Sequence, residues 1–409
     1  MYIPNIEVRR LNNGLKIVLL LSKEINTVYV DSRILFGSGH VAMPGMAHFI
    51  EHLVQFGGTK EYSPENIRKR IADCSLKTNG LTSYLFTKYS GSSPVTGYKE
   101  LFEIFQQRLF YAQFSEEVYE REKTRIQEEI IERKNDNFIN FFDLLFENQA
   151  LQKNSALNCP IGQIKDLDRI SLSKTISIYE RFYHPANILL MVSAPVFMKE
   201  EIIAEIEKLF DINVGRSQQA ASLKPVTLKE GSRKIIRDNN FGNRYFGFVF
   251  PQNKTKDSDL QKAKFIYQQL LSADSVLQEI RDVFGIYCIE PDYFCLPDSL
   301  FVFIYGYAGE EDKILEIEKC LNQKITNNSF APSFLDIVKE KQINNMLIDF
   351  ESDVQLLDMI GDHYCRTQEV ETPAEMLEKI RNLDMRSLQS FVRNIFQIKR
   401  MNVLIVGPN

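Results

Sequence analysis

Apolar and polar positions along the chain follow two periods, one typical of strands and one typical of helices. Residues 14–21 and 27–36 are rich in β-branched and apolar side chains, and residues 81–90 alternate polar and apolar positions, so all three segments predict strands. Residues 47–56 predict a buried helix, and residues 118–134 predict a long charged helix. Strands and helices mixed in this way indicate an α+β fold, with helices packed on a largely antiparallel or mixed sheet.

The second half of the chain repeats features of the first half at a constant offset of 216 residues. Three pairs match at this offset: 48–52 with 264–268, 83–86 with 299–302, and Phe114 with Phe330. A constant offset at three separate places predicts a duplicated domain. The small and polar residues that follow Val214 predict a linker. We therefore expect an N-terminal domain at 1–214, a linker at 215–230 and a homologous C-terminal domain at 231–409.

Composition and charge exclude several classes of protein. A chain of 409 residues with 44% hydrophobic and 25% charged residues is typical of a globular protein with two domains. The net charge of −5, without a strongly basic stretch, argues against a nucleic-acid partner. No apolar run is long enough to span a bilayer, the first residues lack the pattern of a signal peptide, and the six cysteines are scattered. We expect a cytoplasmic protein without a membrane partner.

The segment His48-Phe49-Ile50-Glu51-His52 carries the strongest chemical signal in the sequence. On a helix, His48 and His52 lie one turn apart on the same face, which is the separation that two imidazoles need to bind one Zn²⁺. Glu51 reaches the edge of the same site, where a carboxylate can take a proton from water. The pattern H-x-x-E-H is typical of a class of zinc peptidases. The alternative is a helix with two surface or capped histidines.

The C-terminal half lacks this set of side chains. Lys264 and Gln268 stand where the first half has histidines, and Tyr267 stands where it has Glu51. A protonated lysine cannot bind zinc and glutamine is a poor ligand. We therefore expect one metal site per chain, in the N-terminal half.

Two histidines leave a catalytic zinc one protein ligand short, and the long charged helix offers carboxylates. Glu122 and Glu129 are seven residues apart and share a face of the helix. Such a pair suits a ligand together with a neighbour that orients a ligating imidazole. From the helix alone, a solvated charged face with pairs such as Glu129 with Arg133 is the simpler interpretation.

The sequence Gly-Met-Ala-His-Phe-Ile-Glu-His-Leu at 45–53, followed by Gly58-Thr59, resembles the signature of the M16 (pitrilysin or insulinase-like) peptidases, in their short-chain M16B form. In that family a zinc-binding Glu follows the second His by about 77 residues in a segment of type E-x-x-x-V-x-x-E. Residues 122–129 fit this segment, because 129 − 52 = 77. The resemblance therefore implies that Glu129 is a ligand and that Glu122 is its neighbour in the catalytic site.

The resemblance also implies an architecture. Family members have two homologous α+β domains of the LuxS/metalloproteinase-like type, and four such domains enclose a chamber. A chain of this length supplies two of the four, so we expect a homodimer, or a heterodimer with a related M16 subunit. The segment Asn79 to Thr82 is similar to the edge strand of the family, and an extended peptide substrate is expected to pair there, with Asn79 among its contacts.

One segment departs from the family pattern. The C-terminal domain of the family provides an Arg and a Tyr seven residues apart, and both contact the substrate. Here Arg281 keeps its place, Cys288 holds the Tyr position, and Tyr287 comes one residue early. In a strand, a shift of one residue turns the side chain to the other face unless a bulge corrects the register. Arg281 and Tyr287 are nevertheless the candidates for substrate contact in this half.

These observations predict a zinc metalloendopeptidase that cleaves extended peptides or precursor leader segments in an enclosed chamber. His48, His52 and Glu129 are expected to hold one Zn²⁺ per chain, and Glu51 is expected to act as the general base. Two alternatives stay open. The displaced Tyr287 fits a zinc-bearing subunit of a heteromeric processing peptidase whose partner supplies the Arg/Tyr pair. A non-catalytic scaffold subunit is the third possibility, although such proteins typically lose the ligands that this chain retains.

Overall fold

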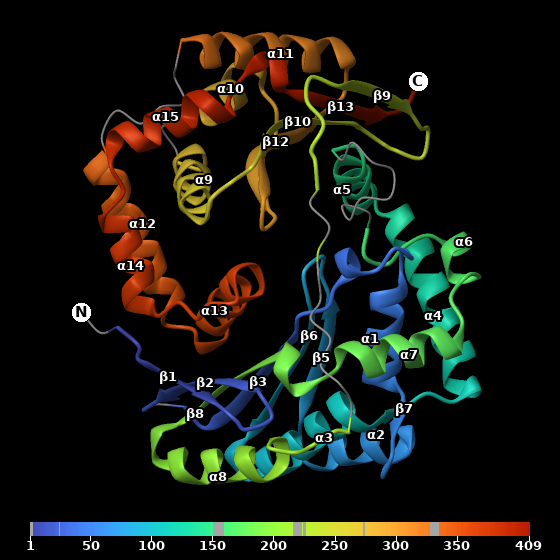
Figure 1. The fold of residues 1–409 in the computed structure, drawn as a ribbon. Helices are drawn as coiled ribbons and strands as arrows, with labels where there is room; N and C mark the ends of the chain where they lie inside the picture. Colours follow the sequence, from blue (N-terminus) through green and yellow to red (C-terminus); the bar gives the residue numbers. More distant parts are fainter. Residues whose placement is uncertain are drawn as a thin grey trace. The chain divides into compact units, whose positions relative to one another are not determined.

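The computed structural model describes residues 3–23, 25–149, 159–215, 223, 226–272, 275–327 and 335–409. Its contacts divide the chain into two compact units, each assembled from three segments of the sequence (Figure 1). Unit 1 comprises Met1–Ile131, Asn158–Lys224 and Asp349–Pro373, and unit 2 comprises Glu132–Leu157, Pro225–Ile348 and Ala374–Asn409. Both units combine residues from the two predicted halves, and most of the predicted linker 215–230 lies outside the described residues.

Unit 1 contains a six-stranded sheet in the order β1-β2-β8-β3-β6-β5, so β5 is an edge strand. All neighbouring strands are antiparallel except β2 and β8, which are parallel. A separate ladder of two short strands, β4 and β7, lies beside it. The strands are β1 (Ile6–Arg10), β2 (Lys16–Ser22), β3 (Thr27–Ile34), β4 (Gly58–Thr59), β5 (Lys77–Thr82), β6 (Thr87–Pro94), β7 (Ala112–Gln113) and β8 (Ile188–Pro195).

The helices of unit 1 pack on this sheet and bury one continuous apolar core. Helix α1 runs along the edge strand β5, and α3 packs on β6 and α8. The helices are α1 (Met46–Phe56), α2 (Pro64–Asp73), α3 (Tyr98–Tyr111), α4 (Glu116–Asn135, whose last turn falls in unit 2), α6 (Ile164–Leu167), α7 (Leu172–Phe182), α8 (Lys199–Phe210) and α13 (Asp353–Thr367). Short 3₁₀ turns are η1 (Ser38–His40), η2 (Val95–Gly97), η3 (Pro185–Asn187) and η4 (Val196–Met198).

Unit 2 has a five-stranded sheet in the order β11-β12-β10-β13-β9, with a second apolar core. Its strands are β9 (Arg233–Arg237), β10 (Arg244–Asn253), β11 (Ile289–Cys295), β12 (Ser299–Ala308) and β13 (Asn402–Gly407). Its helices are α5 (Asn137–Glu147), α9 (Asp257–Leu270), α10 (Val276–Phe284), α11 (Glu311–Thr326), α12 (Leu335–Asp349), α14 (Pro373–Arg381), α15 (Met385–Ile395) and the short η5 (Ile398–Arg400).

The two sheets share one topology, which confirms the predicted α+β fold with two homologous domains. The order β2-β8-β3-β6-β5 in unit 1 corresponds to β9-β13-β10-β12-β11 in unit 2, and in both sheets only the first of these pairs is parallel. Helix α9, which contains residues 264–268, occupies the place of α1. The half with the H-x-x-E-H segment and the half without it therefore have the same framework.

Two details of the sequence analysis need correction. The segment 81–90 is not one strand, because the chain turns at 83–86 between β5 and β6. The Ser83 hydroxyl accepts hydrogen bonds from the backbone N–H groups of Leu85 and Phe86, both at 3.2 Å, and so stabilises the turn. The proposed match of 83–86 with 299–302 consequently pairs a turn with a strand. Phe330, the third matched position, lies outside the described residues.

Each sheet is covered on one face by a helix from the other half of the sequence. Helices α5 and α13 begin 216 residues apart (353 − 137), so they are equivalent in the repeat. Helix α5 packs on β10 and β12 in unit 2, whereas α13 packs on β3 and β8 in unit 1, where it is drawn in orange-red near the blue strands in Figure 1. The duplicated halves have exchanged these helices.

A glycine makes the close approach possible on each side of this exchange. A Cβ on Gly247 of β10 would lie 2.6 Å from Leu145 Cδ1 of α5, and a Cβ on Gly361 of α13 would lie 2.6 Å from the guanidinium of Arg33 on β3. Both distances are shorter than any van der Waals contact, so neither position has room for a side chain. The glycine therefore lies on strand β10 in unit 2 and on helix α13 in unit 1.

Arg33 is the polar centre of the contact between α13 and the sheet. Its side chain is fully buried and pairs with the equally buried carboxylate of Asp31 at 3.2 Å. It also pairs with Asp358 and Asp362 of α13, and its guanidinium lies 4.6 Å from the ring centre of Phe86. A buried guanidinium with several carboxylate partners fixes the position of the helix on the strands.

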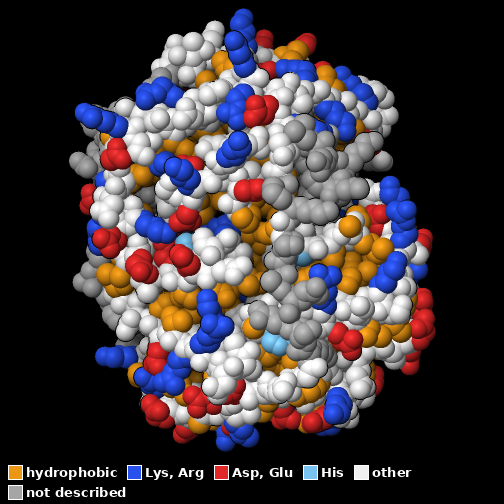
Figure 2. All heavy atoms as spheres, viewed as in Figure 1, with side chains coloured by type: hydrophobic (Ala, Val, Ile, Leu, Met, Phe, Trp, Pro, Cys, Tyr) orange, Lys and Arg blue, Asp and Glu red, His pale blue; other side chains and the backbone are white. Residues whose placement is uncertain are grey.

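Charged side chains form no dominant basic patch on the face drawn in Figure 2. In Figure 2, Lys and Arg side chains are interspersed with Asp and Glu on the face in view, in accordance with the net charge of −5. Among the described residues, no helix combines the length and the apolar character that crossing a bilayer requires.

Arg33→Met should destabilise unit 1 by about 3–5 kcal/mol, because the buried Asp31 carboxylate loses its counter-ion. The free energy of unfolding from a urea titration measures the change. Arg68→Met is the matched control, since Arg68 pairs with Glu65 on the surface and its loss should leave the midpoint unchanged. Equal stability of the two variants would contradict the importance of the buried pair.

Candidate metal centre

Helix α1 presents both histidines and a carboxylate at the edge of the sheet of unit 1. Gly45, in the left-handed conformation (φ 80°), precedes the helix, and Gly57 ends it with a hydrogen bond to the carbonyl of Leu53. Apart from the exposed Phe56, the apolar residues between them are buried in the core of unit 1. His48 and His52 share the remaining face, and their ring centres are 4.6 Å apart.

Helix α4 brings a carboxylate to the two imidazoles. One Oε atom of Glu129 lies 3.7 Å from His48 Nε2 and 3.5 Å from His52 Nε2. The three donor atoms lie within 4.8 Å of one another, so these residues could hold a metal ion. Two imidazole nitrogens and one carboxylate oxygen are a common ligand set of catalytic zinc, which leaves a further position for water or substrate.

Glu122 orients the imidazole of His52. It belongs to the buried stripe of α4 that also contains Ile126 and Ile130, and its side chain is fully buried. Its carboxylate lies 3.4 Å from His52 Nδ1 and accepts hydrogen bonds from Arg121 and Arg125, both at 3.0 Å. A proton on Nδ1 leaves Nε2 of His52 as the atom that faces Glu129. A carboxylate behind a ligating imidazole fixes its tautomer and its orientation.

The same contacts shift the pKa values of both groups in the metal-free protein. Burial raises the pKa of Glu122, but the hydrogen bonds from His52 and Arg121 outweigh it and hold the pKa below its usual value. Burial alone would lower the pKa of His52, whereas the carboxylates of Glu122 and Glu129 raise it to about 9. His52 is therefore protonated near neutral pH without metal, and a metal ion must displace this proton.

Glu51 lies between the metal ligands and the edge strand. Its side chain is 6% exposed, and its carboxylate lies 3.7 Å from His48 Nε2. Gly80 of β5 makes room for it, because a Cβ at that position would lie 2.8 Å from Glu51 Cδ and would clash with Oε1. Burial is the main cause that raises the pKa of Glu51 to about 7. A carboxyl group with this pKa can accept and return a proton near neutral pH.

The other predicted contact residues lie in different surroundings. Asn79 is exposed on β5, in the position next to Gly80, so its side chain points to the opposite face of the strand. Arg281 of α10 donates hydrogen bonds to Gln278 and to the carbonyl of Ile289, both at 3.0 Å. Tyr287 precedes β11 and is 88% exposed. The last two belong to unit 2.

Sequence reasoning selected His48, His52 and Glu129, which the structure brings together, but it missed the residues that position them. Gly80 is significant only because α1 places Glu51 against it, and nothing in the sequence around β5 shows this contact. Arg125 was detectable, since it follows Glu122 by three residues and such pairs meet on one face of a helix. The burial of Glu122 was also detectable from its place in the stripe of Val118, Ile126 and Ile130.

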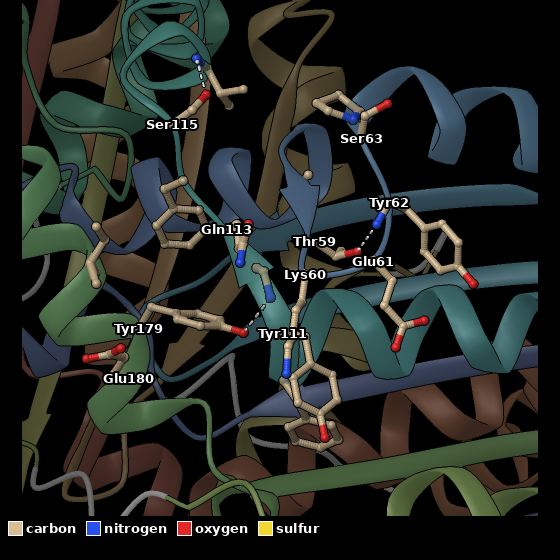
Figure 3. Close-up of a pocket in the computed structure, with 17 residues that line it drawn as sticks. Thr59, Lys60, Glu61, Tyr62, Ser63, Tyr111, Gln113, Ser115, Tyr179 and Glu180 are labelled. Atoms are coloured by element: carbon tan, nitrogen blue, oxygen red, sulfur yellow. Dashed lines mark hydrogen bonds between the residues drawn. The ribbon is translucent and has the colours of Figure 1, made fainter.

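A hollow of unit 1 lies apart from the cluster of His48, His52 and Glu129. It has a volume of about 670 Å³ and is lined by β4, β7 and part of α7 (Figure 3). Two of the polar groups that line it are already paired: the Tyr179 hydroxyl accepts from Ala112 N–H and donates to the Leu109 carbonyl, and Thr59 Oγ1 accepts from Tyr62 N–H. None of the three possible metal ligands lines it, so it offers no comparable chemistry.

Comparison with known proteins gives one consistent result. Residues 19–158 match the model of the insulinase family (peptidase family M16). A zinc protease named PqqE from Helicobacter pylori is 25% identical over 198 residues, which are 48% of this chain and 44% of that protein. The β subunit of the mitochondrial-processing peptidase of Dictyostelium discoideum is 20% identical over 431 residues, with 99% of this chain and 89% of that protein covered.

The fold has a similar counterpart among solved structures. The crystal structure of a protease from Helicobacter pylori has a TM-score of 0.87 with 18% sequence identity, and each chain is covered over its full length. The chain spans less than half the length of several of the zinc proteases that it matches. The segment 19–158, which contains the histidines and both carboxylates of α4, thus matches the M16 family model, and the family resemblance is confirmed.

The pH dependence of the metal-free protein reports the contact between Glu122 and His52. Because the folded-state pKa of His52 is raised to about 9, its contribution to stability is complete below pH 6.5 and is lost as the pH rises from 6.5 through 9. Glu122→Gln should lower this pKa, as an NMR titration of the imidazole would show. Glu128→Gln, an exposed change on the same helix, should leave it unaltered. An unchanged His52 pKa in Glu122→Gln would contradict the contact.

Proposed function

We propose that this chain is a zinc-dependent endopeptidase that cleaves extended peptides or precursor leader segments. The observation that carries the proposal is the convergence of His48, His52 and Glu129 on one point, with Glu51 beside it. The relatives named as zinc proteases and as a processing-peptidase subunit support the same class of reaction. The enclosed chamber of the family would favour unfolded peptides over folded proteins.

The residues present fit a zinc ion. The three donors are of the types that zinc prefers, and the buried carboxylate of Glu122 holds one imidazole in the required tautomer. When bound, zinc polarises a peptide carbonyl and lowers the pKa of water at the site. We expect one ion per chain, since the corresponding helix α9 of unit 2 carries Lys264, Tyr267 and Gln268 instead.

Glu51 is the proposed general base. It accepts the proton of the attacking water and returns it to the leaving amine, and a carboxyl group does both best when its pKa lies near the working pH. Its place against Gly80 keeps the carboxylate beside both the metal ligands and the edge strand. Glu122 acts through His52 and is therefore a positioning residue.

The edge strand β5 is the proposed binding site for the substrate backbone. Its open edge can pair with an extended peptide through main-chain hydrogen bonds, as in strand addition to an exposed sheet edge. Because α1 runs along β5, a peptide paired there passes beside Glu51. Asn79, exposed on the other face of the strand, is placed to contact substrate side chains rather than the reacting bond.

Glu51→Gln should lower kcat for a quenched fluorescent peptide by about 10²–10⁴-fold, because the proton acceptor is lost. Zinc content, measured by mass spectrometry of the purified protein, should stay near one per chain in this variant and fall in Glu129→Gln. Glu128→Gln serves as the control, since this glutamate is exposed on α4. Equal cleavage by wild type and Glu51→Gln, or purification without zinc, would refute the proposal.

The second candidate is the zinc-bearing subunit of a heteromeric processing peptidase. Tyr287 favours it, because this side chain is 88% exposed and precedes β11 instead of lying in the strand. A non-catalytic scaffold is less well supported, since the chain retains three donors and the base.

The isolated chain separates these candidates. If the chain works with its own C-terminal half, it should be a homodimer by native mass measurement, and Tyr287→Phe should reduce kcat/KM by about tenfold or more through the loss of a substrate hydrogen bond. Tyr293→Phe, at a tyrosine of β11 in the same unit, is the control. A chain that is inactive alone, and becomes active with a related subunit lacking H-x-x-E-H, would support the heteromeric form instead.

A further inference from the structure

Arg108 is a buried cation without a carboxylate partner in the described part of the chain. It lies in the last turn of α3 and is 6% exposed. Its Nη1 donates to Gln55 Oε1 and to Thr78 Oγ1, both at 3.3 Å, and its Nε forms no hydrogen bond to any described residue. Burial lowers its pKa to about 10, which still leaves the guanidinium charged at neutral pH. Burying a charge without a counter-ion is unfavourable.

The fold does not require this charge. The other strongly buried guanidinium of unit 1, Arg33, has carboxylate partners, and the partly buried Arg70 pairs with Glu100 and Glu103. The end of α3 offers Arg108 only the partial negative charge of the helix dipole. An apolar side chain of similar length would fill the same space without the desolvation penalty. The charge of Arg108 therefore points to an anion that comes from outside the chain.

The position of Arg108 relative to Glu51 follows from the packing of α1 on β5. Gln55 follows Glu51 by four residues, one turn of the helix, and Thr78 precedes Gly80 by two residues on the same face of the strand. Glu51 lies against Gly80, and Gln55 Nε2 donates to Thr78 Oγ1 at 3.2 Å. The two hydrogen-bond partners of Arg108 thus lie about one helical turn, roughly 5–7 Å, from the proposed base along the edge strand.

We propose that Arg108 determines specificity by binding the carboxylate of an acidic substrate side chain next to the scissile bond. The inference rests on the proposed peptidase function. A peptide paired with β5 directs alternate side chains to the face covered by α1, and the one level with Thr78 points toward Arg108. Hydrogen bonds of 3.3 Å to two neutral oxygens are weak, so a carboxylate replaces the Gln55 and Thr78 oxygens as the stronger, charge-assisted acceptor.

Pairs of fluorogenic peptides that differ only in Glu against Gln, or Asp against Asn, test this proposal on the zinc-loaded enzyme. The pairs are placed at each of the two positions on either side of the cleaved bond. At one position, the wild type should show a kcat/KM ratio for acid over amide of about 10 or more. Arg108→Met should bring that ratio close to 1 and change cleavage of the amide peptide by less than about threefold.

Two further variants separate specificity from structure. Arg70→Met, which removes a guanidinium already paired with Glu100 and Glu103, should keep the wild-type ratio. Arg108→Lys keeps the charge without the planar fork and should give an intermediate ratio. The melting temperature of Arg108→Met should equal or exceed that of the wild type, because an unpaired buried charge is removed.

The outcomes decide between the inference and the function on which it rests. A wild type that cleaves acid and amide peptides equally overturns the role of Arg108 and leaves the peptidase function standing. If Arg108→Met keeps the wild-type ratio of kcat/KM for acid over amide peptides, the role of Arg108 in specificity is overturned as well. A marked fall in the melting temperature of Arg108→Met also overturns it, because the residue would then be structural. A wild type that cleaves no peptide refutes the peptidase function itself, and the inference fails with it.

Discussion

The close packing of α1 against the edge strand β5 is the constraint on which the proposed site depends. A helix can lie this near a strand only where the strand lacks a side chain, and Gly80 provides that place opposite Glu51. One packing contact thereby sets the depth of Glu51, the direction of His48 and His52, and the distance from all three to the open edge of the sheet. The same contact places Gln55 opposite Thr78. The positions of the proposed reacting groups and of the neighbouring side chains therefore depend on the same packing of α1 on β5.

Buried polar groups define the geometry of this region as much as apolar packing does. Glu122 stands at a position of the buried stripe of α4 where an apolar residue would be expected. Its partners come from α1 and α4, so they connect the two helices beside His52. Removing one partner would leave the buried Glu122 carboxylate with fewer groups to compensate its charge. The arrangement is therefore rigid before any metal binds, which is what a preorganised catalytic site requires. Glu129, more exposed than the histidines, is the component with the greatest freedom to adjust.

The sequence predicted the part of the site that depends on local spacing. The pair His48 and His52, with Glu51 between them, follows from helical geometry, whereas the choice of Glu129 over its neighbours depended on the family resemblance. The α+β fold was predictable because apolar residues recur in this sequence at the spacings typical of helices and of strands. The turn at 83–86 was missed because Tyr84 and Phe86 are of residue types that are common in strands. Gly80, Arg108 and the exchanged helices could not be predicted, since each depends on contacts between segments that are far apart in sequence.

The exchange of α5 and α13 bears on how the duplicated chain evolved. After a duplication, one copy that has lost its metal ligands would normally be free to shorten or disappear. Here the sheet of the half with the H-x-x-E-H segment is covered by α13 of the other copy, with Gly361 packed on Arg33, and α5 covers the second sheet in return. Loss of the ligand-free half would expose the sheet that supports the metal site. The surroundings of the histidines thus depend on a helix that begins more than 300 residues away from them in the sequence (353 − 48 = 305).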